Sequence, residues 1–347
     1  MKSKRAILMT LAVLTVSFVL TVIVHSIANA GYNKRRNLTV VFYNVENLFD
    51  TENTPGRNDA EFTPESEKKW TPERYQDKLK VISEVLSSVN QNELPEIIGL
   101  CEVENRKVLD DLVKTNPLEA GKYEIVHFES PDFRGIDVAL LFRPDEFKVT
   151  WSAPVKVSFD AEPDFITRDI LYVKGNATNN EEFHIFVNHW PSRTGGVEQT
   201  EPNRIAAAAI LKSKIDSVQK ANPEANIIVM GDMNDEPSNK SLAGILAAQS
   251  PETENAVLIN LMYPLHEAKQ GSYNYRGNWN MLDNIIVSPG LLDNKGFQCL
   301  EKQGFVFREA WMEYNNNGQI APNRTYGGPN YYGGPSDHFP VFFQLKR

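Results

Sequence analysis

The sequence predicts an α+β fold in which two packed, mixed β-sheets are flanked by helices. Short apolar runs bounded by Gly, Asn or Asp recur along the chain, as is typical of strands buried on both faces. Only three segments have the spacing of an amphipathic helix, and strand-like segments lie between them. Because few helices accompany many strands, we expect the sheets to form the interior and the helices to cover them.

The first thirty residues are typical of a targeting segment. Three basic residues within the first five positions precede an apolar stretch over residues 6–24, and Ala28-Asn29-Ala30 follows. This pattern predicts a secretory signal peptide, residues 1–30, that is cleaved after Ala30. The apolar stretch is also long enough for an uncleaved membrane anchor, which is the alternative. We expect residues 31–37 to form a polar linker and residues 38–347 to form one domain outside the cytoplasm, in the periplasm or the extracellular space.

The composition limits the partners and the cross-links of the chain. The 347 residues include 41% hydrophobic and 23% charged residues, an ordinary globular composition, with a net charge of −9. Removing the three basic residues of segment 1–30, which has no acidic residue, gives about −12. Proteins that bind duplex nucleic acid tightly usually have a basic surface, so this charge argues against a processive or high-affinity nucleic-acid binder. Cys101 and Cys299 are expected to be free thiols, since Cys101 lies in a run that predicts a buried strand.

Strands and helices follow one another in a mixed order. After a first strand over residues 40–44 and a polar loop over residues 50–69, Thr71 and Pro72 begin a helix, with Thr71 as N-cap. Further helices are predicted over residues 201–220 and 238–248. The other strands are predicted over residues 123–128, 136–142, 147–151, 170–173 and 183–187.

Six of the apolar runs end in, or lie beside, a polar residue that can bind a divalent metal or move a proton. A polar group at the end of a buried strand is held rigidly at the rim of a sheet, where sites are commonly built. Together these groups comprise two carboxylates for a metal, a third for a water molecule, two imidazoles and two amides. Such a set suits metal-assisted attack of water on a phosphate ester. The six runs are residues 40–44, 97–102, 185–189, 227–234, 282–287 and 336–341.

Three of these polar residues suit metal, water and phosphate. Glu102 directly follows an apolar strand, and its carboxylate is a hard oxygen ligand for magnesium or manganese. Asp232 and Asn234 follow the most strand-like run and are two positions apart, so their side chains point to the same side of an extended segment. Asp232 can orient a water molecule while Asn234 donates a hydrogen bond to a phosphate oxygen. A plain Asx turn is the alternative.

Two imidazoles are candidates for proton transfer. His338 lies in Ser336-Asp337-His338, and Asp283 is expected to accept a hydrogen bond from its ring and so fix its tautomer. Asp137 is expected to do the same for His189, with a strand-end cap as the alternative for Asp137.

Three further residues are candidates for phosphate binding. Asn188 and Arg193 flank His189 in a polar cluster that suits phosphate. Arg168 can hold a non-bridging phosphate oxygen through its fork of donors, with a surface ion pair to Asp169 or a neighbouring residue as the alternative.

The pattern resembles the endonuclease/exonuclease/phosphatase superfamily, which includes pancreatic-type deoxyribonucleases, abasic-site endonucleases, bacterial sphingomyelinases and inositol-polyphosphate phosphatases. The resemblance covers Leu38 to Leu345. It implies a four-layer αββα sandwich with the site at one rim of the two central sheets. It rests on the motifs Phe42-Tyr43-Asn44-Val45-Glu46-Asn47, Cys101-Glu102, Asn188-His189, Gly231-Asp232-Met233-Asn234, Leu282-Asp283-Asn284-Ile285 and Ser336-Asp337-His338.

The resemblance also implies a metal and a water site. Glu102 would bind the metal, with Asn44 and Asp337 beside it. The expected ion is Mg²⁺, with Mn²⁺ or Ca²⁺ as alternatives. Asp232 would align or deprotonate the attacking water, and Asn234 would stabilise the phosphorane-like transition state.

The resemblance further implies that His189 and the pair His338–Asp283 serve the base and leaving-group sides, and which imidazole serves which side stays open. Abasic-site enzymes tend to lack a His at the position of His189, so its presence resembles the deoxyribonuclease and sphingomyelinase branches. The sequence departs from familiar members in two respects. Cys101 stands where a Gln commonly precedes the metal Glu, and Asn284 stands where an aromatic residue or His is frequent. Neither change removes a group that the chemistry requires.

These observations favour an exported, metal-dependent phosphodiester hydrolase, a nuclease that acts on DNA or RNA as a monomer. One alternative is a phospholipase of the sphingomyelinase type, acting on a phospholipid. Another is a phosphomonoesterase that acts on an inositol or sugar phosphate. A binding module that has lost turnover is the non-enzymatic alternative, and the retention of the whole polar set speaks against it, because function lives in the site.

Overall fold

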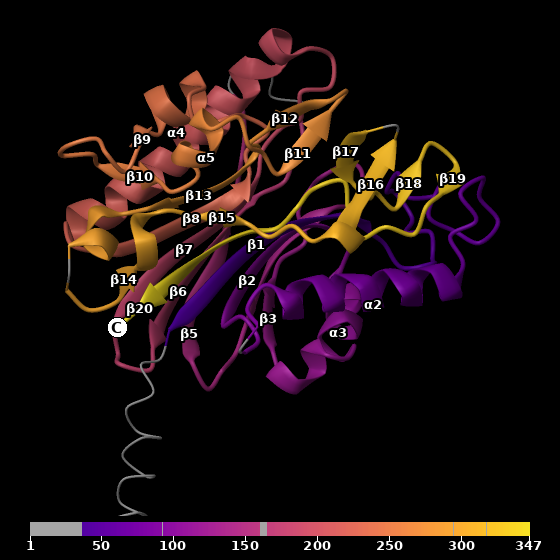
Figure 1. The fold of residues 1–347 in the computed structure, drawn as a ribbon, viewed down its shortest axis with the longest axis horizontal. Coiled ribbons are helices and arrows are strands. Elements are labelled where there is room, and N and C mark those ends of the chain that lie inside the picture. Colours follow the sequence, from indigo (N-terminus) through magenta and orange to yellow (C-terminus); the bar gives the residue numbers. More distant parts are fainter. Residues whose placement is uncertain (1–36, 92, 160–164, 294, 317) are drawn as a thin grey trace, which may run out of the picture. The chain divides into compact units, whose positions relative to one another are not determined.

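Two mixed β-sheets occupy the centre of the structure, a computed structural model that describes residues 37–347 except 92, 160–164, 294 and 317 (Figure 1). Segment 1–30, predicted to be a signal peptide, lies outside the described residues. Sheet A consists of β1 (Leu38–Leu48), β2 (Ile97–Val103), β3 (Glu124–His127), β4 (Asp137–Phe142), β14 (Gln298–Cys299), β15 (Phe305–Val306) and β20 (Val341–Lys346). Sheet B consists of β5 (Phe147–Val155), β6 (Ile170–Ala177), β7 (Glu182–His189), β8 (Asn226–Asp232), β9 (Ala248–Gln249), β10 (Leu258–Asn260) and β13 (Asp283–Val287).

Both sheets mix parallel and antiparallel neighbours. The strand order of sheet A is β14-β20-β1-β2-β4-β3, with β15 also beside β20, and that of sheet B is β5-β6-β7-β8-β13-β10-β9. The pairs β1–β2 and β7–β8 are parallel, so the carboxyl ends of their strands reach the same rim of their sheet. The predicted α+β class with two mixed sheets is therefore confirmed.

Helices and short hairpins surround the sheets. The described helices are α2 (Pro72–Ser88), α3 (Arg106–Val113), α4 (Val197–Ala221) and α5 (Tyr263–Glu267). Three small hairpins pair β11 (Tyr273–Tyr275) with β12 (Asn278–Asn280), β16 (Glu313–Asn316) with β17 (Gln319–Pro322), and β18 (Tyr326–Gly327) with β19 (Asn330–Tyr331). Among the described residues, no helix combines the length and apolar character needed to cross a bilayer.

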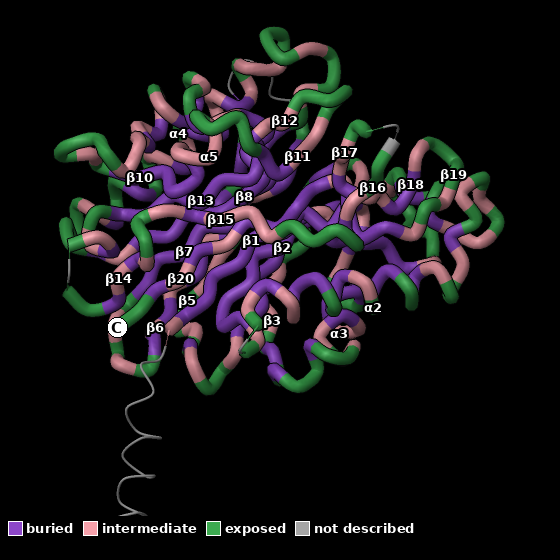
Figure 2. The backbone as a smooth tube through the Cα atoms, in the orientation of Figure 1, coloured by how far each residue is buried: buried purple, intermediate pink, exposed green. Residues whose placement is uncertain are grey.

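The helices and the two sheets form four layers, and an apolar core lies between each layer and the next. The central layer packs sheet A against sheet B, for example Phe42 and Leu140 with Val187 and Met230. A second layer lies between sheet A and the helices α2 and α3, and a third lies between sheet B and α4. Figure 2 shows the buried residues along the central strands and the exposed ones on the loops and outer helices. This order is the four-layer αββα sandwich that the resemblance implied.

Two of the three predicted helices form: α2, and the helix predicted over residues 201–220, which is α4. Thr71 caps α2 through a hydrogen bond from the N–H of Arg74 to its Oγ1, and Pro72 is the first helical residue, as predicted. The helix predicted over residues 238–248 is wrong, because the chain forms only a six-residue π-helical turn, Lys240–Ile245, before β9 begins. The sequence analysis did not predict helix α3. The two cysteines are free and buried, as expected.

Candidate active site

Three neighbouring strand ends of sheet B bring an imidazole and two carboxylates to one rim. In the parallel pair β7–β8, His189 lies opposite Asp232, and in the antiparallel pair β8–β13, Asp232 lies opposite Asp283. His338 reaches the same place from the loop before β20, where it forms an isolated bridge with Tyr273. Pairing between strands distant in sequence therefore gathers four of the predicted site residues.

The facing rim of sheet A has an irregular backbone. Asn44 on β1 lies opposite Cys101 on β2, and the register shifts directly after these residues. Glu46, Asn47 and Glu102 have φ angles of 47°, 55° and 61°. Few residues other than Gly adopt this left-handed region, and bulges of this kind re-aim side chains beside sites. The N–H of Asn47 donates to Oε2 of Glu102 at 3.0 Å, which holds the turned carboxylate in place.

Asp232 lies between the two imidazoles. Its Oδ1 accepts the N–H of Asn234 at 2.9 Å and its Oδ2 accepts Nδ2 of Asn44 at 3.0 Å. The Nε2 atoms of His189 and His338 each lie 3.8 Å from this Oδ2, which is too long for a direct hydrogen bond. Burial raises the pKa of the Asp232 carboxyl to about 7, although His338 opposes the shift.

The two imidazoles have opposite electrostatic environments. Nδ1 of His338 lies 2.6 Å from Oδ2 of Asp283, the pairing that the sequence predicts. Burial alone would lower the pKa of His338, but the charges of Asp283 and Asp232 raise it well above its usual value. Burial, together with the positive charge of Arg168, lowers the pKa of His189 well below its usual value. The pKa values of the two imidazoles are thus shifted in opposite directions, which favours a protonated His338 and a neutral His189.

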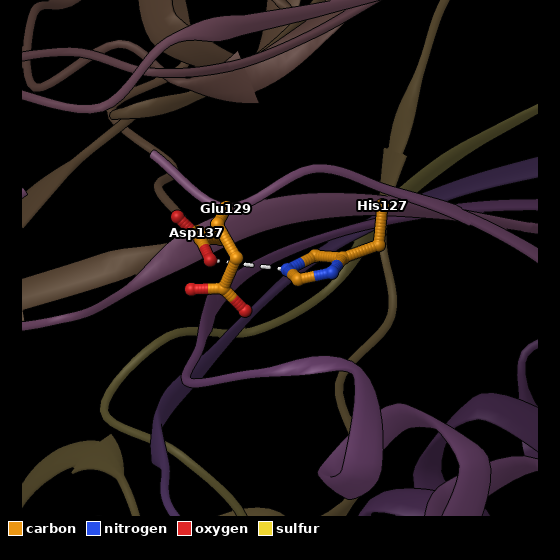
Figure 3. A group of neighbouring side chains, drawn as sticks. All are labelled: His127, Glu129 and Asp137. Atoms are coloured by element: carbon orange, nitrogen blue, oxygen red, sulfur yellow. Dashed lines mark hydrogen bonds and ion pairs between the residues drawn. The ribbon is translucent and has the colours of Figure 1, made fainter. Parts of the chain in front are cut away.

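The expected pairing of Asp137 with His189 is wrong. Asp137 begins β4, and its carboxylate contacts Nε2 of His127 at 3.0 Å and accepts the N–H of Ser130 at 2.8 Å (Figure 3). Nδ1 of His189 has no hydrogen-bond partner among the described residues. The reason is strand order, since β4 adjoins β3 with His127 in sheet A while His189 belongs to sheet B.

The prediction that Asn188 binds phosphate is also wrong. Its Nδ2 donates to the carbonyl oxygens of Phe186 and Met230, both at 3.3 Å, and its Oδ1 accepts Nε1 of Trp190 at 3.2 Å. Alternation along β7 turns Asn188 to the face opposite His189, so its fully buried amide fixes the sheet instead of facing the pocket.

Arg168 lines the pocket, and three of its five N–H donors bind protein oxygens. Its guanidinium donates to Oδ2 of Asp132 at 2.9 Å and to the carbonyl oxygens of His189 and Trp190 at 3.3 and 2.8 Å. These contacts hold the backbone after β7, and the phosphate contact of Arg168 stays a prediction. Its ion-pair partner is Asp132 and not Asp169.

Arg193 has a similar position and similar partners. It donates to the carbonyl oxygen of Asn234 at 2.6 Å, to Oδ1 of Asn280 at 3.1 Å and to Oδ1 of Asn239 at 3.2 Å. These bonds fix the turn that follows β8, and the role of Arg193 in phosphate binding stays a prediction. Arg193 does lie in a polar cluster, but the atoms that it binds in this structure are oxygens of the protein.

Two arginines that the sequence did not single out pair with the carboxylates predicted for the metal. Nη2 of Arg134 lies 3.5 Å from Oε2 of Glu102, and Nη2 of Arg324 lies 3.3 Å from Oδ2 of Asp337. Their side chains are 43% and 42% exposed, so both can reorient toward a ligand. Both lie in loops, where no periodic pattern marks a functional residue.

Glu46 is a further site residue without an assigned role in the sequence. It lines the pocket, and its Oε2 accepts the N–H of Thr325 at 2.7 Å. Burial, followed by the charge of Asp337, raises the pKa of Glu46 to about 7, although buried Lys78 opposes the shift. The sequence could have marked Glu46 as a site residue by its position, two residues after Asn44 at the end of the first strand.

These groups share one pocket of about 1340 Å³. Its walls come from the loop after β1, the loop before α4, the β11–β12 hairpin and the loop around Arg324. It is lined by polar residues of strands from both sheets and of the loops beside them, namely Glu46, Glu102, His189, Asp232, Asn234, Asp337 and His338.

The model of the endonuclease/exonuclease/phosphatase family matches residues 39–347. The chain belongs to this family. A comparison with curated proteins gives no significant match.

Solved structures of the endonuclease/exonuclease/phosphatase family share the fold. A family protein from Bacteroides thetaiotaomicron is 18% identical with a TM-score of 0.56, and the match covers 90% of this chain and 95% of that one. A mannosyl-6-phosphatase from the same organism is 17% identical with a TM-score of 0.56, covering 89% and 99%. TDP2 of D. rerio, complexed with a single-strand DNA product, is 16% identical with a TM-score of 0.55, covering 90% and 99%.

Enzymes of this family use divalent metals, and the donor set of the pocket fits such an ion. Glu102 and Asp337 present carboxylate oxygens, which hard divalent cations prefer, and Arg134 and Arg324 pair with them. Asn44 turns its Nδ2 toward Glu102 and Asp232. It therefore orients these two carboxylates and does not offer its own side-chain oxygen to the metal ion. Donor atoms of Asp232, Asp283 and His338 also lie within 4.8 Å of one another.

Proposed function

We propose that the protein is an exported, metal-dependent hydrolase that cleaves phosphodiesters, with nucleic acid as its foremost substrate. The observation on which this rests is the position of Asp232, whose Oδ2 lies 3.8 Å from Nε2 of both His189 and His338. A carboxylate between two imidazoles can orient one water molecule for attack while a proton is accepted on one side and donated on the other. The family's phosphoesterase fold supports this reading.

In the proposed reaction, the oxygen of a water molecule aligned by Asp232 forms a bond to phosphorus as the bond to the leaving oxygen breaks. Neutral His189, with Nε2 toward the pocket, accepts the proton of the water. His338 lies between Asp283 and Asp232, at 2.6 and 3.8 Å, and donates a proton to the leaving oxygen. Nδ2 of Asn234 donates one hydrogen to the carbonyl oxygen of Trp190 at 3.1 Å, and its second hydrogen can be donated to the charged phosphoryl group in the same pocket.

Glu102 and Asp337 would hold a divalent metal, which supplies positive charge against the charge that develops on the phosphoryl oxygens. Mg²⁺ is the proposed ion, with Mn²⁺ and Ca²⁺ as alternatives. The protein itself fixes the carboxylate of Glu102, which accepts hydrogen bonds from Nδ2 of Asn44 at 3.5 Å and from the N–H of Asn47 at 3.0 Å.

A phosphomonoesterase is the second candidate. The net charge of −9 disfavours a long nucleic-acid contact, whereas the exposed Arg134 and Arg324 suit the two charges of a terminal phosphate. Among the similar structures, one is a sugar-phosphate phosphatase and another holds a DNA product. A sphingomyelinase-type activity on phospholipid stays the third candidate. Export is proposed from the sequence of segment 1–30.

The test is a hydrolysis panel on plasmid DNA, RNA, sphingomyelin, inositol phosphates and mannose 6-phosphate, with Mg²⁺, Mn²⁺, Ca²⁺ or chelator. We expect cleavage of nucleic acid that requires a divalent ion. Cleavage of the monoesters alone would replace the diesterase by the second candidate, and hydrolysis undiminished by chelator would overturn the metal. Cell fractionation of the full chain tests export, which cytoplasmic retention would contradict.

A further inference from the structure

A second group of ligating side chains lies at the base of the β3–β4 connection, outside the pocket. His127 ends β3, Glu129 follows it in the loop, and Asp137 begins β4 (Figure 3). Nε2 of His127 lies 3.0 Å from Oδ2 of Asp137, and these two side chains are only 3% and 2% exposed. A buried imidazole therefore faces a buried carboxylate, with Glu129 beside them at the surface.

The three side chains are close enough to share one ion. One donor atom of each lies within 4.8 Å of the others. The oxygen of Asp137 that does not face His127 accepts the N–H of Ser130, which fixes the carboxylate. Arg57 lies 3.8 Å from the carboxylate of Glu129, and its guanidinium donates to backbone oxygens at 2.6 and 3.0 Å.

We propose that His127, Glu129 and Asp137 form a second metal site, which takes a divalent ion of the zinc class. One imidazole nitrogen with two carboxylates suits Zn²⁺ or Co²⁺ better than Mg²⁺, which prefers oxygen alone. Bonds of about 2.0–2.1 Å in tetrahedral geometry separate two donors by roughly 3.3 Å. The present gap between His127 and Asp137 is 3.0 Å, so the ion needs only a small opening. The ion takes the place of the hydrogen between Nε2 of His127 and Asp137: a neutral ring binds it after that hydrogen moves to Nδ1, and a protonated ring binds it by releasing that hydrogen to solvent.

The position of this site connects it with the pocket. The loop between His127 and Asp137 contains Asp132, which holds Arg168, and Arg134, which pairs with Glu102 and also binds the side chain of Asn47. An ion that joins the two ends of this loop reduces the conformations open to it. The second metal is therefore structural, and it positions Arg134 at the pocket without contacting substrate.

The experiment is a zinc titration of chelator-stripped full-length protein by calorimetry, with Co²⁺ absorption as the spectroscopic readout. We expect the wild type to bind one Zn²⁺ more than His127→Gln or Glu129→Gln. We also expect the visible band of tetrahedral Co²⁺ to lose intensity in both variants. Glu124→Gln removes the same charge from an exposed position of β3 and should keep the full stoichiometry. Mg²⁺ in excess should leave this equivalent of zinc in place.

Equal stoichiometry in the wild type and both variants would overturn the site, and a hydrogen bond alone would then explain the His127–Asp137 contact. Because Glu129 is exposed, its variant keeps the test valid even if His127→Gln does not fold. Glu102→Gln removes the ion of the pocket while leaving this second ion. A protein that fails the hydrolysis panel but still loses one zinc in Glu129→Gln would refute the proposed function and support the second site.

Discussion

The two rims that form the pocket are built differently. On sheet B, His189, Asp232 and Asp283 occupy adjacent strand ends in regular register and are buried. On sheet A, Glu46 and Glu102 have left-handed backbone, the register shifts, and partly exposed arginines balance the carboxylates. Groups that exchange protons need fixed separations, which regular strands supply. Carboxylates that receive an ion need an opening, which an irregular strand end supplies.

The largest effect is expected on the rim of sheet B. Asp232→Asn and His189→Ala should each lower kcat by ~10²–10⁴-fold, since each removes a proton acceptor or the group that aligns the water. Steady-state kinetics on the substrate found in the panel would measure this, beside thermal unfolding to show an intact fold. Asp216→Asn, the same exchange on the surface of α4, is the matched control. Rates like those of the wild type in both site variants would contradict the site assignment.

Asp283→Asn should lower kcat by ~10²-fold or more, because the ring of His338 loses the carboxylate that orients it. The charge of Asp283 helps to raise the pKa of His338, so its removal should lower that pKa. The pH above which activity declines should therefore move to lower values, as the proton donor is lost earlier. A pH–rate profile for both proteins measures the shift. An unchanged alkaline limb would mean that His338 is not the acid.

The rim of sheet A should respond to metal concentration. Glu102→Gln weakens the proposed ligand set, so the Mg²⁺ needed for half-maximal activity should rise by more than ~10-fold, the effect of losing even an outer partner of a ligand. Titration of activity with Mg²⁺ measures this, and Asp232→Asn should show no such rise relative to its own maximum. Equal metal dependence in Glu102→Gln and wild type would place the ion elsewhere.

This contrast also explains what the sequence could predict. Strand ends and their polar residues follow from local patterns, so His189, Asp232, Asp283 and His338 were found together. The hydrogen-bond partners of Asp137, Arg168 and Asn188 could not be predicted in this way, because they depend on strand order and on the packing of distant segments. Arg134 and Arg324 lie in loops that no periodicity marks, and only the folded chain brings them to the pocket.

Arg134→Ala should raise KM by ~10-fold with a smaller change in kcat, the size expected for one charge-assisted hydrogen bond to a phosphate. Its side chain is 43% exposed, so the fold should tolerate the change. Michaelis–Menten analysis of Arg134→Ala and Arg324→Ala compares the two arginines that balance the carboxylates. A fall in kcat with constant KM would instead show that Arg134 acts only in the transition state.

The smallest effect on turnover is expected at Asn188, although His189 is its neighbour. Asn188→Leu should keep kcat per folded molecule within ~3-fold, since the amide faces the sheet and not the pocket. It should lower the free energy of unfolding by ~1–3 kcal/mol, because Nε1 of buried Trp190 loses its acceptor. Denaturant unfolding beside kinetics separates the two quantities. A large loss of kcat in a stable protein would return Asn188 to the phosphate site, whereas a loss of stability alone shows that regular strands position catalytic groups through neighbours that never touch substrate.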